Sequence, residues 1–412
     1  MAVGAVLDAP ALFQTYILNT VQAALERIQA TGQTLPNEQD RDLALYSLDY
    51  ALKLPEAWPL TGSLLTALAP KMEQAGHRYD WIAFLDAGID VSRATGDLAS
   101  EAELHLQKGI LFQLLAQYDQ ADRQYVLSQA GFTATADQRG LARVLNRRAF
   151  VTRRLGRHAE AEAHAAAAMA LLAADDAELG YSYQVLGTIA YDRMQWGEAA
   201  RRFEQSLQLL AGGDDWRLLG WAHSNLGLAL WRTGDLAAAE TRLLQAMDIF
   251  AVIGDPIHQS VARLNLGNVL VARGELERAL QVYTDAEAVF RKVQDIERLA
   301  SVNNNIAKIL REQGKLADAL PAARRSVEYY SLVNEPVELI NALDGLGETC
   351  ISLEDWTAAA EAYQAALSHI DEVDNAAWQA SKRAEIEAIL RDIERQAGGQ
   401  IELQTSEVAG SA

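Results

Sequence analysis

The sequence predicts an all-α solenoid built from about eight antiparallel helix pairs. Three observations support this prediction: an internal period of 40 residues, a turn signal that recurs in every unit, and small residues at two fixed places. Three consecutive segments, which begin at Asn225, Asn265 and Asn305, align without a gap. Periods of about 20 to 50 residues are typical of solenoids and other repeat arrays. The repeat therefore decides the fold class.

The composition agrees with a folded chain and limits its partners. The 412 residues are 50% hydrophobic and carry a formal net charge of −20. No apolar run approaches the roughly 18 residues of a transmembrane helix, and the acidic excess repels phosphate, so neither a membrane nor nucleic acid is an expected partner. The single cysteine, Cys350, and an N-terminus without a signal-peptide pattern predict a cytoplasmic protein.

Residues 1–56 are predicted to form an N-terminal helical cap. Residues 10–31 and 38–53 have amphipathic helical patterns, and LPNEQD between them supplies a turn and a helix start. Five of the eight prolines lie at or before Pro70, so this end is built differently from the rest.

Residues 57–95 are predicted to be a degenerate first repeat. Gly76 marks its turn, but Trp81 stands where the other units have a small residue. A bulky ring at that place should splay the two helices or mark a boundary.

Residues 96–373 are predicted to form seven helix–turn–helix repeats. Their turns are expected at Ala116, Gly156, Met194, Gly234, Gly274, Gly314 and Glu354. A small residue follows each turn by five positions, and another lies twelve residues before that one, as Ala199 and Gly187 do. Small residues at these places let two helix backbones approach closely.

The C-terminal end is predicted to close the stack. Residues 374–396 contain KRAEIEAILRDIER and are expected to form a charged capping helix that faces water. Residues 397–412 are expected to be a disordered tail. Pro321 lies inside a predicted second helix and should bend it.

These units resemble the tetratricopeptide repeat family. Its pattern of small, large and aromatic residues is matched by Leu186–Gly187, Trp196, Ala199, Phe203 and Ser206 in one unit, and by Leu266–Gly267, Leu276, Ala279, Tyr283 and Ala286 in another. The resemblance covers about residues 57–373 and implies a right-handed superhelix whose first helices line a concave groove. The family's closing proline is absent, and the 40-residue units are similar to repeats of STAND ATPases, CHAT proteases and kinesin light chains.

No motif for catalysis or metal binding emerges, so we expect no enzymatic activity and no cofactor. Gly314–Lys315 lacks the upstream glycine of a phosphate-binding loop. His158 and His164 have no nearby histidine or cysteine partner, which favours surface or packing roles over a metal site. Cys350 is expected to be a buried, inert thiol.

The resemblance instead places the candidate binding residues on the first helices. The exposed positions of the groove lie six and three residues before the small residue, and one and four after it. From these positions and the adjoining arginines we predict a peptide-binding set of Arg143, Asn146, Arg147, Arg153, Tyr181, Gln184, Thr188, Tyr191, Trp221, Ser224, Trp231, Asn268, Asn304, Lys308 and Arg311.

Within this set, a basic island is unusual for so acidic a chain. It comprises Arg139, Arg143, Arg147, Arg148, Arg153, Arg154 and Arg157, with Asp137 the only acid in the stretch. Guanidinium groups can hold carboxylates in a fork, which would suit an acidic ligand. The alternative is that these arginines pair with acids on adjacent helices.

Aromatic and amide side chains form the other two features. Tyr181, Tyr191, Trp221 and Trp231 are predicted to project toward the groove as rigid binding anchors, unless they serve packing between repeats. Asn225, Asn265 and Asn305, with Asn303 and Asn304, could hold an extended peptide backbone. They could equally tie adjacent repeats together.

The sequence thus predicts a non-enzymatic scaffold whose concave groove binds a peptide or protein segment with acidic and hydrophobic residues. The alternative is a sensor or regulatory subunit that controls a separately encoded effector, such as a STAND ATPase or a CHAT protease. The oligomeric state is left open, a monomer included.

Overall fold

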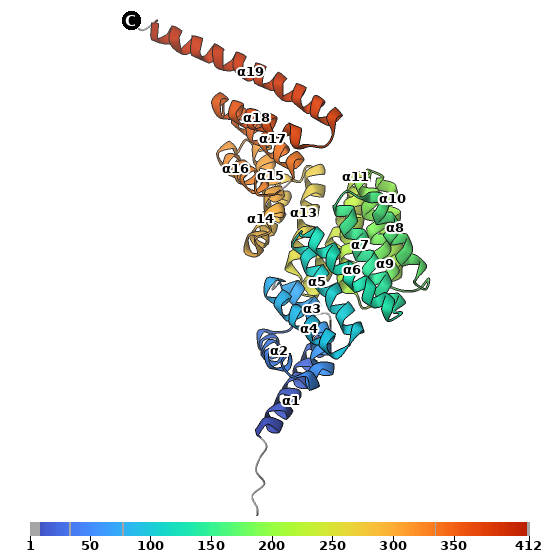
Figure 1. The fold of residues 1–412 in the computed structure, drawn as a ribbon. Helices are drawn as coiled ribbons and strands as arrows, with labels where there is room; N and C mark the ends of the chain where they lie inside the picture. The colour runs from blue at the N-terminus through green and yellow to red at the C-terminus, as the bar shows by residue number, and fades with distance from the viewer. Residues whose placement is uncertain (1–8, 33, 76–77, 334, 410–412) are drawn as a thin grey trace, which may run out of the picture. The chain divides into compact units, whose positions relative to one another are not determined.

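A computed structural model describes residues 9–32, 34–75, 78–333 and 335–409 (Figure 1). All regular structure in these ranges is helical, and most consecutive helices within each part of the chain pack together. The all-α fold of stacked helix pairs is therefore confirmed. The chain divides into two compact units, Met1–Gln259 and Ser260–Ala412, and each is described by itself.

Unit 1 begins with helices that precede the regular repeats. They are α1 (Ala9–Ala30), α2 (Glu38–Ala51), the short 3-10 helix η1 (Pro55–Ala57), α3 (Trp58–Ala75) and α4 (Arg78–Thr95). The predicted helices at 10–31 and 38–53 are confirmed to within two residues. Asn37 caps α2, because its side chain accepts a hydrogen bond from the backbone N–H of Asp40 at 2.9 Å. Gly76, the expected turn of the degenerate repeat, lies outside the described residues.

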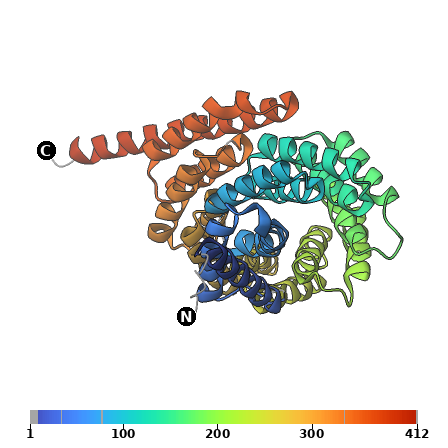
Figure 2. The ribbon, with the colours of Figure 1, turned by 60° about the horizontal axis from the view of Figure 1, so that its bottom comes forward.

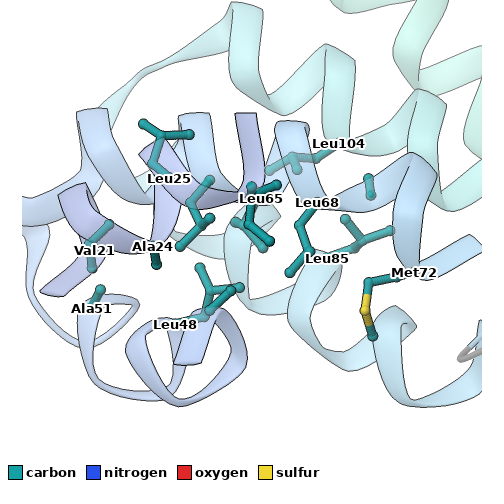
Figure 3. Close-up of a cluster of buried hydrophobic side chains, with 14 of the residues drawn as sticks. Val21, Ala24, Leu25, Leu48, Ala51, Leu65, Leu68, Met72, Leu85 and Leu104 are labelled. Carbon is teal, nitrogen blue, oxygen red and sulfur yellow. The ribbon is translucent and has the colours of Figure 1, made fainter. Parts of the chain in front are cut away.

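The N-terminal helices and the first regular helix, α5 (Leu98–Leu114), share one hydrophobic core (Figure 3). Figure 3 shows Val21, Ala24 and Leu25 of α1, Leu48 and Ala51 of α2, Leu65, Leu68 and Met72 of α3, Leu85 of α4 and Leu104 of α5. Trp81 is fully buried in the same core and lies 5.5 Å, centroid to centroid, from Phe84. The large ring therefore fills space between α4 and its neighbours.

The other repeats of unit 1 follow in pairs. Their helices are α6 (Tyr118–Ala134), α7 (Gln138–Arg154), α8 (His158–Ala170), α9 (Glu178–Asp192), α10 (Trp196–Leu210), α11 (Trp216–Thr233) and α12 (Leu236–Val252). In Figure 2 these helices, cyan to yellow-green, follow one another along a curve. The strongest contacts of α5, α7, α9 and α11 are with the helix that follows each of them.

A left-handed residue makes each turn between paired helices. All seven turn positions predicted for residues 96–373 have positive φ, from 56° at Ala116 to 88° at Gly234. Glycine adopts this conformation without steric cost, whereas Ala116, Met194 and Glu354 adopt it despite a Cβ. The predicted turns are therefore confirmed, including the three that lack glycine.

Unit 2 continues the pattern, and the division between units falls within α13 (Pro256–Ala272). The helices that follow are α14 (Leu276–Val293), α15 (Ile296–Glu312), α16 (Leu316–Tyr330), α17 (Pro336–Ser352), α18 (Trp356–His369) and the 3-10 helix η2 (Ile370–Glu372). Helix α16 continues through Pro321 as one helix.

The last helix differs from the prediction. Helix α19 spans Ala376–Ala409, so it extends into residues 397–412, for which the sequence predicts a disordered tail. Of that tail, residues 410–412 lie outside the described residues. Propagation of an existing helix adds one hydrogen bond for each residue fixed, which lets it continue past Gly398 and Gly399. The N-terminal part of α19 packs against other helices of unit 2, α18 among them, through Ile386, which is fully buried, and Ile393.

Candidate functional site

The candidate surface in unit 1 consists of first helices α7, α9 and α11. Two of them start at an aspartate cap: Asp137 accepts a hydrogen bond from Gly140 N–H, and Asp215 accepts one from Leu218 N–H. Because each repeat packs on the next with a nearly constant period, equivalent positions of neighbouring first helices come together. Side chains from three repeats can therefore meet at one place.

Most of the basic island is neutralised by acids on neighbouring helices. Both terminal nitrogens of Arg143 bond to Glu103 of the preceding first helix, at 2.8 and 3.0 Å. Arg148 bonds to Asp122 at 2.9 Å, Arg153 bonds to Asp192 at 2.7 Å, and Arg139 lies 3.4 Å from Asp176. The structure therefore confirms, for these four arginines, the alternative of pairing within the fold. Arg143 and Arg153, which belong to the predicted binding set, are thus engaged in ion pairs within the fold.

Arg147 is different, because its main partner is an aromatic ring. Its guanidinium carbon lies 3.9 Å from the centroid of the Tyr181 ring. Among the described residues, no carboxylate lies within 4 Å of its guanidinium nitrogens. Burial lowers the pKa of Arg147, but Tyr181, Glu178, Tyr125 and Glu73 together outweigh burial and raise it. Arg147 is thus a half-buried cation that stays charged and stacks on a ring.

Arg217, at the start of α11, binds a residue that lies 144 positions earlier in the chain. Its Nη1 donates to Oε1 of Glu73 at 2.7 Å, and the two side chains are only 16% and 7% exposed. Glu73 lies in the last turn of α3, which belongs to the N-terminal helices. The first-helix surface of the repeats is therefore in direct contact with the segment that precedes them.

Asp255 completes this network from the loop before α13. Its carboxylate lies 3.4 Å from Nε of Arg217 and 2.7 Å from Nδ1 of His258, and it also accepts the backbone N–H of His258 at 3.0 Å. Burial raises the pKa of Asp255, but His258 and Arg217 outweigh burial and lower it to about 2. The His258 ring lies 5.1 Å from that of Trp221, so a predicted site residue is held against this network.

Four members of the predicted set are buried and tie repeats together. Tyr181, Gln184 and Ser224 are 4 to 5% exposed, and Asn146 is fully buried. Asn146 donates to Glu178 at 2.8 Å and accepts from Ser182 at 2.9 Å, both on α9. Burial makes these four residues inaccessible to a ligand, and the polar groups of Asn146 and Gln184 serve the contact between adjacent repeats. This corrects their predicted role in the groove.

Asparagines that the sequence offers as possible ligands of a peptide backbone also join adjacent repeats. The Asn225 side chain donates to Gln184 at 2.8 Å, and that of Asn305 donates to Asn268 at 3.3 Å. Each bond joins the first helices of neighbouring repeats. The interpretation that these amides tie repeats together is confirmed for these two pairs.

The other aromatic residues keep part of their surface exposed. Trp221, Trp231 and Tyr191 are half-buried, and so is Thr188 on α9. The Arg232 guanidinium carbon lies 4.5 Å from the centroid of Trp196 and 5.3 Å from that of Trp231. The indole N–H of Trp221 is buried, and no described residue accepts a hydrogen bond from it. Trp221 and Trp231 thus offer partly accessible apolar rings.

In unit 2 the predicted residues are more exposed but less clustered. Lys308 is exposed, and Asn304 is half-buried. Asn268 accepts a hydrogen bond from the Tyr283 hydroxyl at 2.6 Å. Arg311 pairs with Glu348 and donates to the carbonyl of Gly345 at 3.2 Å. Two of these four side chains are therefore held by neighbouring helices.

Sequence reasoning missed Glu73, Arg217 and Asp255. Each stands outside the positions at which the family resemblance places ligands. Arg217 lies one place after Trp216 in the first turn of α11, and it is equivalent to Arg139 of the basic island. This shared repeat position is the one feature of the sequence that could have pointed to Arg217. A single sequence does not indicate a contact between residues 144 positions apart.

The described residues offer little else that could support chemistry. They contain no group of three or more histidine, cysteine or acidic residues that could hold a metal ion. None of their helices is long and apolar enough to span a membrane. Cys350 is buried, and burial raises the pKa of its thiol, as expected for an inert cysteine.

Comparison with known sequences and structures identifies the repeats. Residues 218–292 and 298–371 match the family model described as tetratricopeptide repeat, whereas no curated protein matches the sequence. A Rap protein complexed with competence and sporulation factor is 14% identical, with a TM-score of 0.55, over 82% of this chain and 99% of the Rap chain. The apo form of RapI is also 14% identical, with a TM-score of 0.51, over 66% of this chain and all of RapI (100%).

A STAND protein with a tetratricopeptide repeat sensor, from Pyrococcus horikoshii, is 12% identical with a TM-score of 0.55. The match covers 87% of this chain and 55% of the STAND protein, so this chain corresponds to about half of that protein. At these identities the similarity establishes the fold alone.

Proposed function

Because residues 218–292 and 298–371 are tetratricopeptide repeats, we propose that the chain is a non-enzymatic scaffold that binds a peptide or protein segment on its first helices. The segment carries an acidic side chain and a hydrophobic one. A cytoplasmic setting is part of the proposal, since there the buried thiol of Cys350 stays reduced.

One observation carries the proposal: Arg147 stacks on Tyr181 without a carboxylate within ion-pair distance among the described residues, whereas Arg143, Arg148 and Arg153 each have one. A charge-assisted hydrogen bond to an incoming carboxylate would be stronger than a neutral one, and more so where water is excluded. The partly accessible rings of Trp221 and Trp231 would supply apolar contact for the same segment.

A labelled peptide of alternating glutamate and leucine tests the proposal by fluorescence anisotropy. Arg147→Gln should weaken binding and reduce its dependence on salt, since one screened charge interaction is lost. Trp221→Ala with Trp231→Ala should remove most of the binding while the circular dichroism spectrum stays helical. The matched control is Arg123→Gln, because Arg123 is an exposed arginine on second helix α6. Equal binding by all four proteins would refute the proposal.

The second candidate is a sensor or regulatory subunit that acts on a separately encoded effector. The contact between Glu73 and Arg217 favours it, since ligand binding could then alter how the N-terminal helices contact the repeats. A STAND protein with a tetratricopeptide repeat sensor shares the fold. Co-purification of a STAND ATPase or a CHAT protease that dissociates when the peptide is added would support this function over a passive scaffold.

A further inference from the structure

The last turn of α3 is unusually well buried for so polar a segment. Lys71, Met72, Glu73 and Gln74 are 8%, 2%, 6% and 7% exposed. Buried charged residues are rare unless they are paired, because removing a charge from water is costly. The partners of these side chains therefore show what the turn is bound to.

Two different surfaces hold this turn. On one side, the Lys71 ammonium donates to the backbone carbonyls of Gly32 and Thr34, at 2.8 and 2.9 Å, and Met72 lies in the N-terminal core. On the other side, Glu73 binds Arg217 of the repeats. Glu73 is thus presented by the N-terminal helices to a first helix of the repeats.

The negative charge of Glu73 acts on the arginines of the repeats as the carboxylate of an acidic ligand would. Glu73 stabilises the charged forms of Arg217 and Arg147. Burial lowers the pKa of both guanidinium groups, whereas the negative charge of Glu73 raises it. It stands at the C-terminal end of α3, where the helix dipole adds partial negative charge. A carboxylate on a helix end therefore already binds Arg217, and its charge also acts on Arg147.

We propose that Glu73 is an internal ligand: its carboxylate holds the place that an acidic side chain of a partner takes at Arg147 and Arg217. Binding of an acidic segment then requires release of the last turn of α3 from the first helices. This inference rests on the proposed function, and it adds the chemistry of the ligand and the competitor that regulates its binding.

The neutral variant Glu73→Gln tests the inference because it keeps the size of the side chain and removes its charge. Without any ligand, hydrogen–deuterium exchange should speed up in the peptide that contains residues 70–74. Trypsin should also cut after Lys71 more readily. The matched control is Asp86→Asn, which neutralises the partner of Lys108 between α4 and α5 and should leave both readouts unchanged.

A fluorescein-labelled peptide of eight glutamates is the binding probe, with eight glutamines as its neutral counterpart. Removal of an internal competitor raises the fraction of protein that can bind, so Glu73→Gln should bind the acidic probe about tenfold more tightly than the wild type. Arg217→Gln should also free the turn of α3, but it should weaken the probe, because it removes part of the site. The two variants therefore agree in exchange and differ in affinity.

Three outcomes separate this inference from the proposed function. Unchanged exchange and affinity in Glu73→Gln, together with weaker binding by Arg147→Gln, would overturn the inference and leave the function standing. If none of the proteins binds the acidic probe, both fail. Faster exchange with tighter binding in Glu73→Gln, and faster exchange with weaker binding in Arg217→Gln, supports the inference.

Discussion

Gly187 on α9 lies directly against the ring of Phe203 on α10, so that a Cβ added to Gly187 would stand 2.5 Å from Cε1 of the ring. The two residues occupy the small position of a first helix and the aromatic position of its partner. The same relationship joins Gly347 to Tyr363, where the distance to Cε2 would also be 2.5 Å. Close approach of the paired helices therefore depends on the missing side chain.

Gly187→Ala should destabilise the protein by about 1 to 3 kcal/mol, because overpacking forces a rigid ring or the backbone to move. Urea denaturation followed by circular dichroism measures the change. Gly197→Ala is the control, since a Cβ there meets nothing within 4 Å and alanine favours the helix. Equal stability of the two variants would show that the pair tolerates a wider separation.

Arg143 and Glu103 should show a coupling free energy of about 1 to 3 kcal/mol in a double-mutant cycle, because their bonds are bidentate and only partly exposed. The cycle uses Arg143→Gln and Glu103→Gln, singly and together, in urea denaturation. The pair Arg395 and Asp392, whose side chains are 78% and 66% exposed, should couple by less than about 1 kcal/mol. A coupling no larger at Arg143 than at this exposed pair would contradict the expectation.

Asp255 should contribute stability that disappears in acid. Its folded pKa, lowered to about 2, is below the ordinary value of 3.8, so its contribution is complete above about pH 4 and is lost as the pH falls toward 2. The loss should be on the order of 2 kcal/mol and should be absent in Asp255→Asn, which keeps a capping oxygen. Chemical denaturation from pH 5 to pH 2 measures it. Asp214→Asn, in an exposed loop, should retain the wild-type slope.

His223 should lower stability at mildly acidic pH. Burial, with help from Arg242, lowers the pKa of His223 to about 4, whereas the unfolded chain binds the proton near 6.5. Stability is therefore complete above about pH 6.5 and falls as the pH approaches 4, by about 1 kcal/mol at pH 5 once partial exposure is allowed for. His223→Gln should flatten the change in melting temperature between pH 7 and pH 5. His369→Gln, at the partly exposed end of α18, should not.

The repeats could be predicted from sequence because their signals are local. Turns at Ala116, Met194 and Glu354 follow from a constant period even though none of them is glycine. The binding surface could be predicted only in part, because sequence periodicity shows which face of a helix is turned inward and not what covers it. Periodicity therefore predicts Asn146 and Tyr181 in a groove, whereas in the structure both lie in contacts between repeats.

The contact between Glu73 and Arg217 shows the other limit. It joins a helix outside the repeat pattern to one inside it, and neither residue belongs to a motif. The length of helix α19 could not be predicted for a different reason. Gly398 and Gly399 disfavour helix locally, but a helix that has already formed continues past them.

Contacts between first helices recur at intervals of one repeat, as from Glu103 to Arg143 and from Arg153 to Asp192. Each such bond links a helix pair only to its immediate neighbour, so these stabilising contacts are divided among similar interfaces between adjacent repeats. Once the long-range contact between Glu73 and Arg217 has broken, a stretching force applied to the two ends of the repeat array should therefore separate one helix pair at a time. The extension of the array would then increase in small steps, one for each helix pair that separates.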